Sequence, residues 1–482
     1  MKKFKLFLEN MLVYGVGGVI SKIIPLIMVP IITRLLPNST YYGLSDLCST
    51  IISFGASIAV LGMYDAMYRM YFEKNDEQYR RRVCSTAVTF TLFFSLFISI
   101  IMFVLRDVLS LIAFGDTEYS YLVCIAAIAT ASSSTNNIVA APTRMQNKKI
   151  IYILINTLSP LIAYSVTIPL ILKGCYIVAV PVGAMISGFI IESIYLFLNH
   201  KCFKFSEFDR NILKELLKIA IPLFPTFLIY WIFNSCDKLM ISNMLNISQV
   251  GIYSTGSKLG NCSQIIYVAF TGGWQYFSFS TMRDKNQVET NSRIFEYLGV
   301  LSFAATIFVF ALCRPIYSVL FTEEYTPGYI VAPYLFLAPL LQMLFQISCN
   351  QFLIIKKSLP IPLTLTIGAI VNIILNYLLI QAIGIEGAAI ATLFGFAVST
   401  GLCVLLLTKK KMMEVRSKFF VAIAIIILYI LTWRFIIMGS VIVSLIIAII
   451  SSFLLGRLYY SDIKILAQMI FKGGKKNENT IC

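Results

Sequence analysis

Blocks of about twenty apolar residues, separated by short polar segments, run along almost the whole chain. Each block is long enough to cross about 30 Å of hydrocarbon as an α-helix. The blocks lack the alternation of polar and apolar positions found in membrane barrels, so the pattern predicts an all-α integral membrane protein. We predict fourteen spans, at residues 10–33, 44–64, 83–105, 119–141, 150–172, 176–198, 218–243, 251–272, 295–314, 330–352, 359–381, 384–407, 418–437 and 439–456.

The basic residues predict how these spans are oriented. If fourteen spans alternate in direction, 31 of the 39 Lys and Arg residues fall on one face and only 5 on the other. Basic loops stay on the cytoplasmic side, so we expect both termini to be cytoplasmic. The first apolar block is longer than the core of a signal peptide and has no small-residue cleavage site before Arg34, which predicts an uncleaved span.

An internal repeat divides the chain. The segment ITRLLPNSTYYGLSDL (32–47) resembles ISNMLNISQVGIYSTG (241–256) with one residue of gap, and each joins the end of one predicted span, the first or the seventh, to the start of the next. The match predicts a duplication of about 208 residues, whose two copies share one orientation because six spans separate them. We expect two pseudo-symmetric six-helix lobes, at 1–205 and 206–410, followed by two more spans and a cytoplasmic tail at 411–482.

The amino-acid composition argues against several classes of function. The 482 residues are 58% hydrophobic with a mean hydropathy of +0.83, and they leave no room for a large soluble domain. The net charge of +16 belongs to the cytoplasmic loops, so it does not indicate nucleic-acid binding. With one histidine, His200, and eleven scattered cysteines without a CxxC pair, we expect neither a metal site nor a cofactor.

Ionisable residues within the spans are the candidates for a functional site, because a charge in hydrocarbon is costly. They gather in the repeat-related spans, and a cavity between two lobes lined by several cations would attract a phosphate or diphosphate. The candidate substrate-binding residues are Lys22, Arg34, Lys238 and Lys258, and the candidate ion-pair or coupling residues are Asp46 and Asp237.

Several of these residues could have a structural role in place of a role in substrate binding. Arg34 and Asp46 lie near the outer interface, where they could pair with each other or reach toward water. Asp237 and Lys238 are adjacent, so they point to different faces of their helix. Glu192 is predicted at an inner helix end, where a solvated or paired carboxylate is expected.

Acidic motifs of an enzyme are sparse. Asp116 and Glu118 lie in a small outer loop, and Glu207 and Asp209 form an equally isolated cytoplasmic pair. Neither pair has a second acidic partner or a catalytic domain beside it. We therefore predict that the protein is not an enzyme.

Four stretches, in this order and spacing, are similar to one known family. They are TRLLPNSTYYGLSDL (33–47), GMYDAMYRMYFEKND with YRRRV (62–83), SCDKLMIS with VGIYSTGSKL (235–259) and AIGIEGAAIATLFGFAVS (382–399). Together they resemble the Wzx/PST-type flippases for O-antigen or capsule repeat units, within the multidrug/oligosaccharidyl-lipid/polysaccharide exporter superfamily.

The resemblance implies an alternating-access carrier in the bacterial plasma membrane. It would move undecaprenyl-diphosphate-linked oligosaccharide units from the inner to the outer leaflet for surface polysaccharide biosynthesis. Glycosyltransferases inside and a polysaccharide polymerase outside would be its partners, and we expect a monomer. By position in the matching stretches, Arg34, Lys238 and Lys258 would bind the anionic headgroup, while Lys22 is a candidate from its depth alone.

Three alternatives remain at this point. A multidrug or cation antiporter of the same superfamily would need a mainly acidic cavity. A flippase for a peptidoglycan precursor would share both the topology and the diphosphate chemistry. A membrane glycosyltransferase would depend on Asp116 and Glu118.

Overall fold

A computed structural model describes residues 22–464, apart from residues 147, 283, 285, 356, 358, 439 and 463. The first part of the first predicted span (10–21) and most of the predicted cytoplasmic tail (465–482) therefore lie outside the described residues. Within them the chain is helical and contains no strand, as the apolar pattern predicts.

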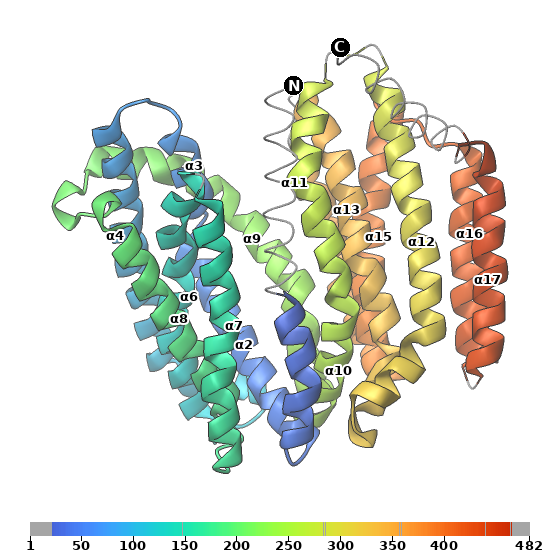
Figure 1. Cartoon of the computed structure of the whole chain (residues 1–482), viewed down its shortest axis with the longest axis horizontal. Helices are drawn as coiled ribbons and strands as arrows, with labels where there is room; N and C mark the ends of the chain where they lie inside the picture. The colour runs from blue at the N-terminus through green and yellow to red at the C-terminus, as the bar shows by residue number, and fades with distance from the viewer. Residues whose placement is uncertain are drawn as a thin grey trace, which may run out of the picture.

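The helices form two groups, which lie side by side in Figure 1. Residues 22–35 are helical and lead into the first group. That group contains α2 (Ser39–Val60), α3 (Met63–Tyr71), α4 (Glu77–Val104), α5 (Arg106–Phe114), α6 (Ser120–Met145), α7 (Lys149–Leu172) and α8 (Ala179–Leu198), and the short turns η1 (His200–Cys202) and η2 (Phe205–Glu207) follow it.

The second group begins with the longest helix, α9 (Arg210–Met244). It continues with α10 (Ile247–Gly260), η3 (Asn261–Ser263), α11 (Gln264–Ser280), α12 (Gln287–Leu320), η4 (Glu323–Ile330), α13 (Ala332–Ile354), α14 (Pro360–Ile383) and α15 (Ile385–Lys409). The chain then forms α16 (Ser417–Thr432), a π-helical turn η5 (Trp433–Ile437) and α17 (Val441–Leu458).

Twelve of the described helices are long and apolar enough to span a membrane, close to the fourteen predicted. The first predicted span is described only in part. The eighth is built from two pieces, α10 and α11, which the single turn η3 joins at Asn261–Ser263. Neither piece alone reaches the length of about 20 residues that a crossing requires.

The repeat found in the sequence occupies matching structural positions. Asn38 caps the N-terminus of α2 and Asn246, 208 residues later, caps that of α10, both with extended backbone. Each side-chain oxygen accepts a backbone N–H of the first turn, which satisfies a donor that the helix leaves free.

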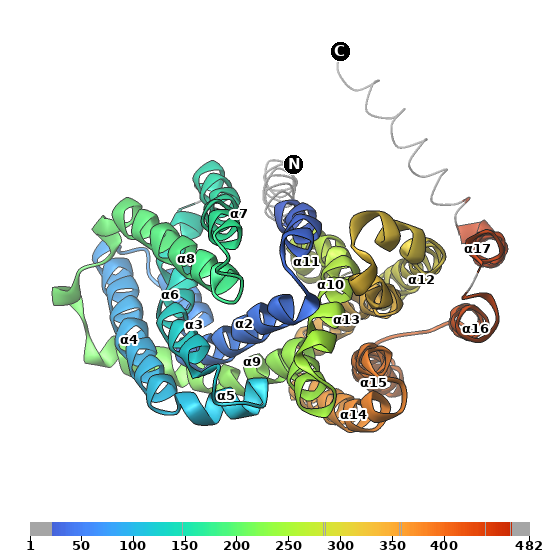
Figure 2. The same cartoon turned by 90° about the horizontal axis from the view of Figure 1, so that it is seen from below.

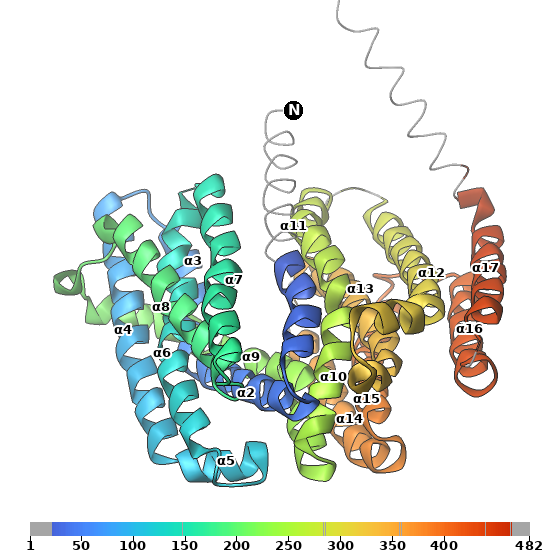
Figure 3. The ribbon, with the colours of Figure 1, turned by 60° about the horizontal axis from the view of Figure 1, so that its bottom comes forward.

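The two repeat copies also pack directly on each other. The hydroxyls of Ser39 and Ser248 lie 2.6 Å apart, and α2 and α10 lie side by side (Figure 3). A Cβ on Gly43 would meet the carbonyl oxygen of Ile247 at 2.2 Å, and one on Gly251 would meet that of Ser39 at 2.0 Å. Only glycine allows the two backbones to come this close.

Helix α9 links the two groups. Ile212, Leu216 and Ala220 in its first half belong to the apolar core of the first group. Phe233 and Ile241 in its second half belong to a larger apolar core, which is formed mainly by the second group and also includes residues of α2, α4, α5 and α6. Among the described residues, the extensive contacts between the groups are those of α9 and those between α2 and α10.

The pair α16–α17 lies at the edge of the second group (Figure 2). At one end, the guanidinium of Arg416 contacts the fully buried carboxylate of Glu296 on α12, with Nε 2.6 Å from Oε2. Partial burial alone would raise the pKa of Asp462, but hydrogen bonds from Lys418 and Arg416 outweigh it and hold that pKa well below its usual range.

Ion pairing also holds the opposite end of this helix pair. There Arg434 of η5 donates from Nε to both oxygens of Glu386, at 2.7 and 2.9 Å. Between the two ends, an apolar groove of about 910 Å³ separates α16 from α13 and α15.

We predict that Gly251→Ala destabilises the protein, because its Cβ would overlap the Ser39 carbonyl unless α2 and α10 move apart. Overpacking of this kind costs about 1–3 kcal/mol. The matched control is Gly401→Ala on α15, where nothing lies within 4 Å of the added Cβ, and where alanine favours the helix by about 0.5–1 kcal/mol. Thermal unfolding in detergent should show a lower Tm only for Gly251→Ala; equal Tm values for both variants would contradict the close packing.

Candidate functional site

Asp46 is the centre of the candidate site. It lies on α2, two turns after the Asn38 cap, and its side chain is only 6% exposed. Its Oδ2 lies 2.7 Å from Nζ of Lys238, its Oδ1 lies 3.8 Å from Nζ of Lys258, and Ser254 donates a hydrogen bond to Oδ2 at 2.7 Å. A carboxylate buried among apolar helices is tolerated when its charge is paired and its lone pairs are satisfied, which these three partners achieve.

The two lysines approach Asp46 from the second repeat. Lys238 belongs to α9 and Lys258 to the last turn of α10, so the cluster joins both groups of helices where α2 meets α10. Lys238 is largely buried by its ion pair, whereas 47% of the Lys258 side chain stays exposed. One carboxylate against two ammonium groups leaves the cluster with a net positive charge, and Lys258 is its accessible cation.

Asp237 forms no ion pair with either lysine in the described part of the chain, although its carboxylate lies near enough to Lys238 and Asp46 to interact with their charges. Its carboxylate accepts the hydroxyl of the buried Tyr253 and the backbone N–H of Lys238, at 2.8 Å for the latter. The adjacent residues therefore face different sides of α9, as their spacing predicts.

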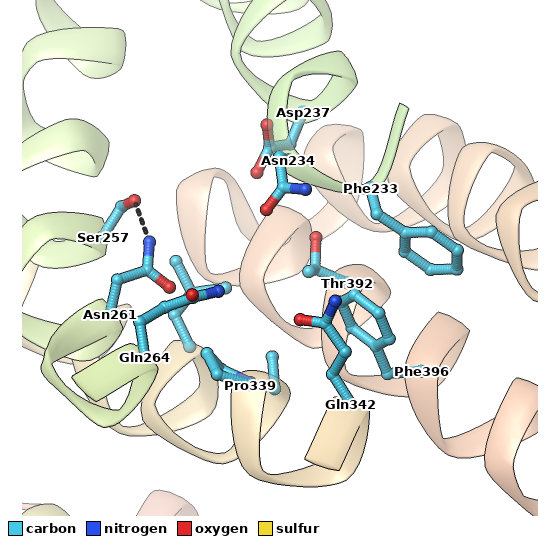
Figure 4. Close-up of a pocket in the computed structure, with 12 residues that line it drawn as sticks. Phe233, Asn234, Asp237, Ser257, Asn261, Gln264, Pro339, Gln342, Thr392 and Phe396 are labelled. Atoms are coloured by element: carbon cyan, nitrogen blue, oxygen red, sulfur yellow. Dashed lines mark hydrogen bonds between the residues drawn. The ribbon is translucent and has the colours of Figure 1, made fainter. Parts of the chain in front are cut away.

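Asp237 faces a small polar pocket within the second group, shown in Figure 4. The pocket has a volume of about 30 Å³, enough for an ordered water molecule. Amide and hydroxyl side chains from α9, α10, η3, α11, α13 and α15 line it, namely Asn234, Ser257, Asn261, Gln264, Gln342 and Thr392. No group of three or more His, Cys, Asp or Glu residues within the described part of the chain could hold a metal ion.

Arg34 and Lys22 do not join the cluster. The exposed Arg34 donates from Nη2 to the carbonyl oxygen of Val319 at 2.8 Å, in the last turn of α12. A cation is favourable there, because the free carbonyls carry the negative end of the helix dipole. Of the two roles left open for Arg34, pairing with Asp46 is wrong: Asp46 pairs with the lysines instead. Lys22 is half-buried at the start of the described residues. No carboxylate in the described part of the chain forms an ion pair with it.

Sequence reasoning missed Ser254, which donates to Asp46. Ser254 lies 208 residues after Asp46 and so occupies the same position in the second repeat. The repeat alignment could have revealed this contact, because it places Asp46 and Ser254 at equivalent positions of the two copies. Their side chains meet where α2 packs on α10.

Comparison with known proteins identifies the family. A family model described as "Polysaccharide biosynthesis protein" matches residues 31–329, which include both repeat segments and all of the Asp46 cluster. The chain belongs to this family. The resemblance inferred from the sequence motifs is thereby confirmed. No curated protein matches the chain.

Solved structures with the same fold are transport proteins of the membrane. The lipid II flippase MurJ in an inward closed conformation has a TM-score of 0.71 and 14% identity, over 94% of this chain and 99% of that one. An inward-facing multidrug resistance MATE family transporter of the MOP superfamily has a TM-score of 0.66 and 14% identity, over 81% and 94%. A Vibrio cholerae MATE transporter has a TM-score of 0.63 and 11% identity, over 85% and 98%.

These comparisons establish the fold of this polysaccharide biosynthesis protein. It is a multi-pass membrane protein with the helical architecture shared by MurJ and the MATE transporters. Because these structures are at most 14% identical to this chain, the similarity establishes the fold only. The substrate must be inferred from the residues of this chain.

We predict that Asp46→Asn destabilises the protein by about 3–5 kcal/mol, because it leaves Lys238 buried without a counter-charge. Adding Lys238→Met should recover much of the loss, since the orphaned charge is then removed. Asp107→Asn serves as a control, because Asp107 is exposed and pairs only with its neighbour Arg106. Thermal unfolding of the wild type, the control, both single variants (Asp46→Asn and Lys238→Met) and the double variant measures this; additive losses in the double variant would contradict a buried pair.

Proposed function

We propose that this protein is a flippase for undecaprenyl-diphosphate-linked oligosaccharide repeat units, used in surface polysaccharide biosynthesis. Family membership, the fold of a transporter and the charge of the Asp46 cluster support this function. The single observation that carries it is the Lys258 side chain, which is about half exposed beside a buried ion pair at the junction of the two repeats. A diphosphate needs such a cation, because crossing hydrocarbon with its charge uncompensated is prohibitively costly.

The proposed carrier alternates access between the two faces of the membrane. Its lobes would be residues 1–205 and 206–410, with residues 411–482 as an appended helix pair and tail. The contact of α2 with α10 would then close the outer end of the pathway, because the helix starts at Asn38 and Asn246 lie on the face that is poor in basic residues. Export requires this contact to open.

In this proposal Lys258 is the first group to meet the headgroup, with Lys238 behind it. Lys22 and Arg34 would bind the substrate only in another conformation, since here they lie apart from the cluster. Asp46 forms an ion pair, which keeps the lysines in place until a diphosphate competes for them. The coupling role would belong to Asp237, which faces its own polar pocket.

The proposed location is the bacterial plasma membrane, with both termini cytoplasmic and the chain acting as a monomer. Glycosyltransferases on the cytoplasmic side would supply the lipid-linked unit, and a polymerase on the outer side would consume it. Translocation itself requires no bond to form or break, in keeping with a protein that is not an enzyme.

A multidrug or cation antiporter of the same superfamily is the second candidate. One observation favours it: the buried carboxylate of Asp237 faces a pocket lined by amide and hydroxyl oxygens. Efflux of cationic dyes that depends on Asp237 and persists in a Lys258→Ala variant would support the antiporter over the flippase.

We predict that Lys258→Ala lowers polysaccharide export at least tenfold without loss of membrane insertion. The accessible cation is removed, while Asp46 keeps its buried pair with Lys238. Lys258→Arg should retain most export because it keeps the charge. The measurement is surface polymer in a deletion strain that carries each variant at equal protein level. Normal polymer with Lys258→Ala would remove Lys258 from the site.

We also predict that a disulfide between Ser39→Cys and Ser248→Cys stops export, because it locks α2 to α10 at the proposed outer closure. The matched control is Ser159→Cys with Ser187→Cys, whose hydroxyls lie 3.1 Å apart between α7 and α8 within one group. Both pairs would be made in a chain without its native cysteines. Export should fall on oxidation and return on reduction for the first pair only; export through an oxidised Ser39–Ser248 pair would contradict alternating access at this contact.

A further inference from the structure

Glu192 is a buried carboxyl group outside the Asp46 cluster. It lies on α8, six residues before the end of a membrane-spanning helix, and is 8% exposed. Six residues correspond to about 9 Å of helix, so the group sits below the membrane surface rather than at the helix end. Of the solvated and paired roles expected for Glu192, the solvated one is wrong, because its side chain packs against α6.

The surroundings of Glu192 contain hydroxyls in place of cations. Its Oε1 is hydrogen-bonded to the hydroxyl of Thr135 on α6, and the hydroxyl of Ser132, one turn earlier, lies beside the same carboxyl group. No lysine or arginine in the described part of the chain forms an ion pair with Glu192. An ionised carboxylate in apolar surroundings without a counter-charge is very costly, so the group is favoured in its neutral form.

The hydrogen bonds of the Thr135 hydroxyl are consistent with a neutral Glu192 carboxyl group. The Thr135 oxygen lies 3.0 Å from the carbonyl oxygen of Ala131, 3.3 Å from that of Ser132, and within hydrogen-bond distance of Glu192. A hydroxyl has one hydrogen to donate but two lone pairs to accept. If Thr135 donates to a carbonyl of its own helix, the contact with Glu192 is satisfied when the protonated carboxyl donates to Thr135.

Helices α6 and α8 pack closely one turn away from Glu192. A Cβ on Gly188 of α8 would lie 2.9 Å from the Ser132 hydroxyl oxygen, so α6 and α8 are in close contact. The Ser132 hydroxyl is buried and has no hydrogen-bond partner in the described part of the structure. It is the group that can turn to donate to Glu192 once the carboxyl has lost its proton.

No other titratable group described near α8 provides a counter-charge for Glu192. Helices α2, α6 and α7 pack against α8. Asp46 on α2 is paired with its lysines, and Arg144 on α6 contacts Tyr64 at the inner end of the helix, nine residues beyond Thr135. The remaining titratable side chains described on these four helices are Tyr41, Tyr42, Cys48, Tyr121, Cys124, Tyr152, Tyr164 and Tyr195, none of which carries a charge near neutral pH.

From this geometry we infer that Glu192 is a proton-binding site of the first helix group. In the conformation described here, the carboxyl is protonated and donates to Thr135. When α6 and α8 separate enough to admit water, the carboxyl O–H bond breaks, the proton passes to water, and Ser132 donates to the carboxylate that remains. Proton binding at Glu192 would thus favour the tightly packed arrangement of α6 and α8, whatever substrate the protein carries.

Infrared difference spectroscopy of the purified protein in lipid nanodiscs tests this inference directly. The wild type minus Glu192→Gln spectrum at pH 7 should contain the C=O stretch of a protonated carboxylic acid, which shifts in D₂O. The matched control, Glu289→Gln, removes an exposed carboxylate paired with Arg293, and its difference spectrum should contain only carboxylate bands. A difference spectrum for Glu192→Gln that contains only carboxylate bands, with or without a dependence on sodium, would overturn the inference.

Thermal stability gives a second readout that does not depend on transport. Glutamine has nearly the same shape as the protonated acid and cannot ionise, so Glu192→Gln should match the Tm of the wild type at about pH 4, where the carboxyl is largely protonated in both the folded and the unfolded chain. As the pH rises from about 4 to about 7, the wild type should lose Tm relative to Glu192→Gln, because the carboxyl ionises in the unfolded chain while it stays protonated in the folded one. A constant Tm difference across this range would contradict a protonated Glu192.

Discussion

A carboxylate within the hydrocarbon region must find its counter-charge inside the protein, and this constraint organises the site around Asp46. The partners of Asp46 come from the other repeat: Lys238 at 2.7 Å, Lys258 at 3.8 Å and the hydroxyl of Ser254 at 2.7 Å. Because breaking a buried pair costs about 3–5 kcal/mol, the cluster fixes where α2 meets α9 and α10. The close approach of Gly43 and Gly251 makes that meeting geometrically possible.

The internal duplication explains how such a cluster arises. Asn38 and Asn246 keep the same capping role 208 residues apart, so the two copies begin their helices in the same way. Asp46 and Ser254 occupy matching positions but differ in chemistry, and one donates to the other. Two copies of one segment therefore form an asymmetric charged junction where α2 meets α10.

The sequence predicts most of the fold because the bilayer imposes a simple length rule on each apolar block. It predicts the spans less well where tertiary contacts extend or bend them. Helix α9 begins at Arg210, well before the predicted start at residue 218, because its first turns bury Ile212 and Leu216 against the first group. The eighth span is broken at η3, in a stretch without proline whose composition does not reveal the bend.

The candidate site is predictable only as a set of residues, since partners depend on packing that a single sequence does not contain. The cost of burying charge singles out Asp46, Lys238 and Lys258, which lie together in the structure, but sequence proximity suggests the wrong ion-pair partner, Arg34, for Asp46. Glu192 shows the same limit. Its predicted place at the inner end of a span suggests a solvated or paired group, whereas the close contact of α6 and α8 buries it.

The central claim is that this protein moves complete lipid-linked saccharide units across the membrane. The most direct measurement is deletion of its gene, scored for surface polysaccharide and for the side of the membrane on which lipid-linked repeat units accumulate. If the protein is a flippase, we expect loss of polymer, with complete repeat units trapped in the cytoplasmic leaflet and released when the wild-type chain is restored. Normal polymer in the deletion strain, or repeat units that are missing or truncated, would contradict it.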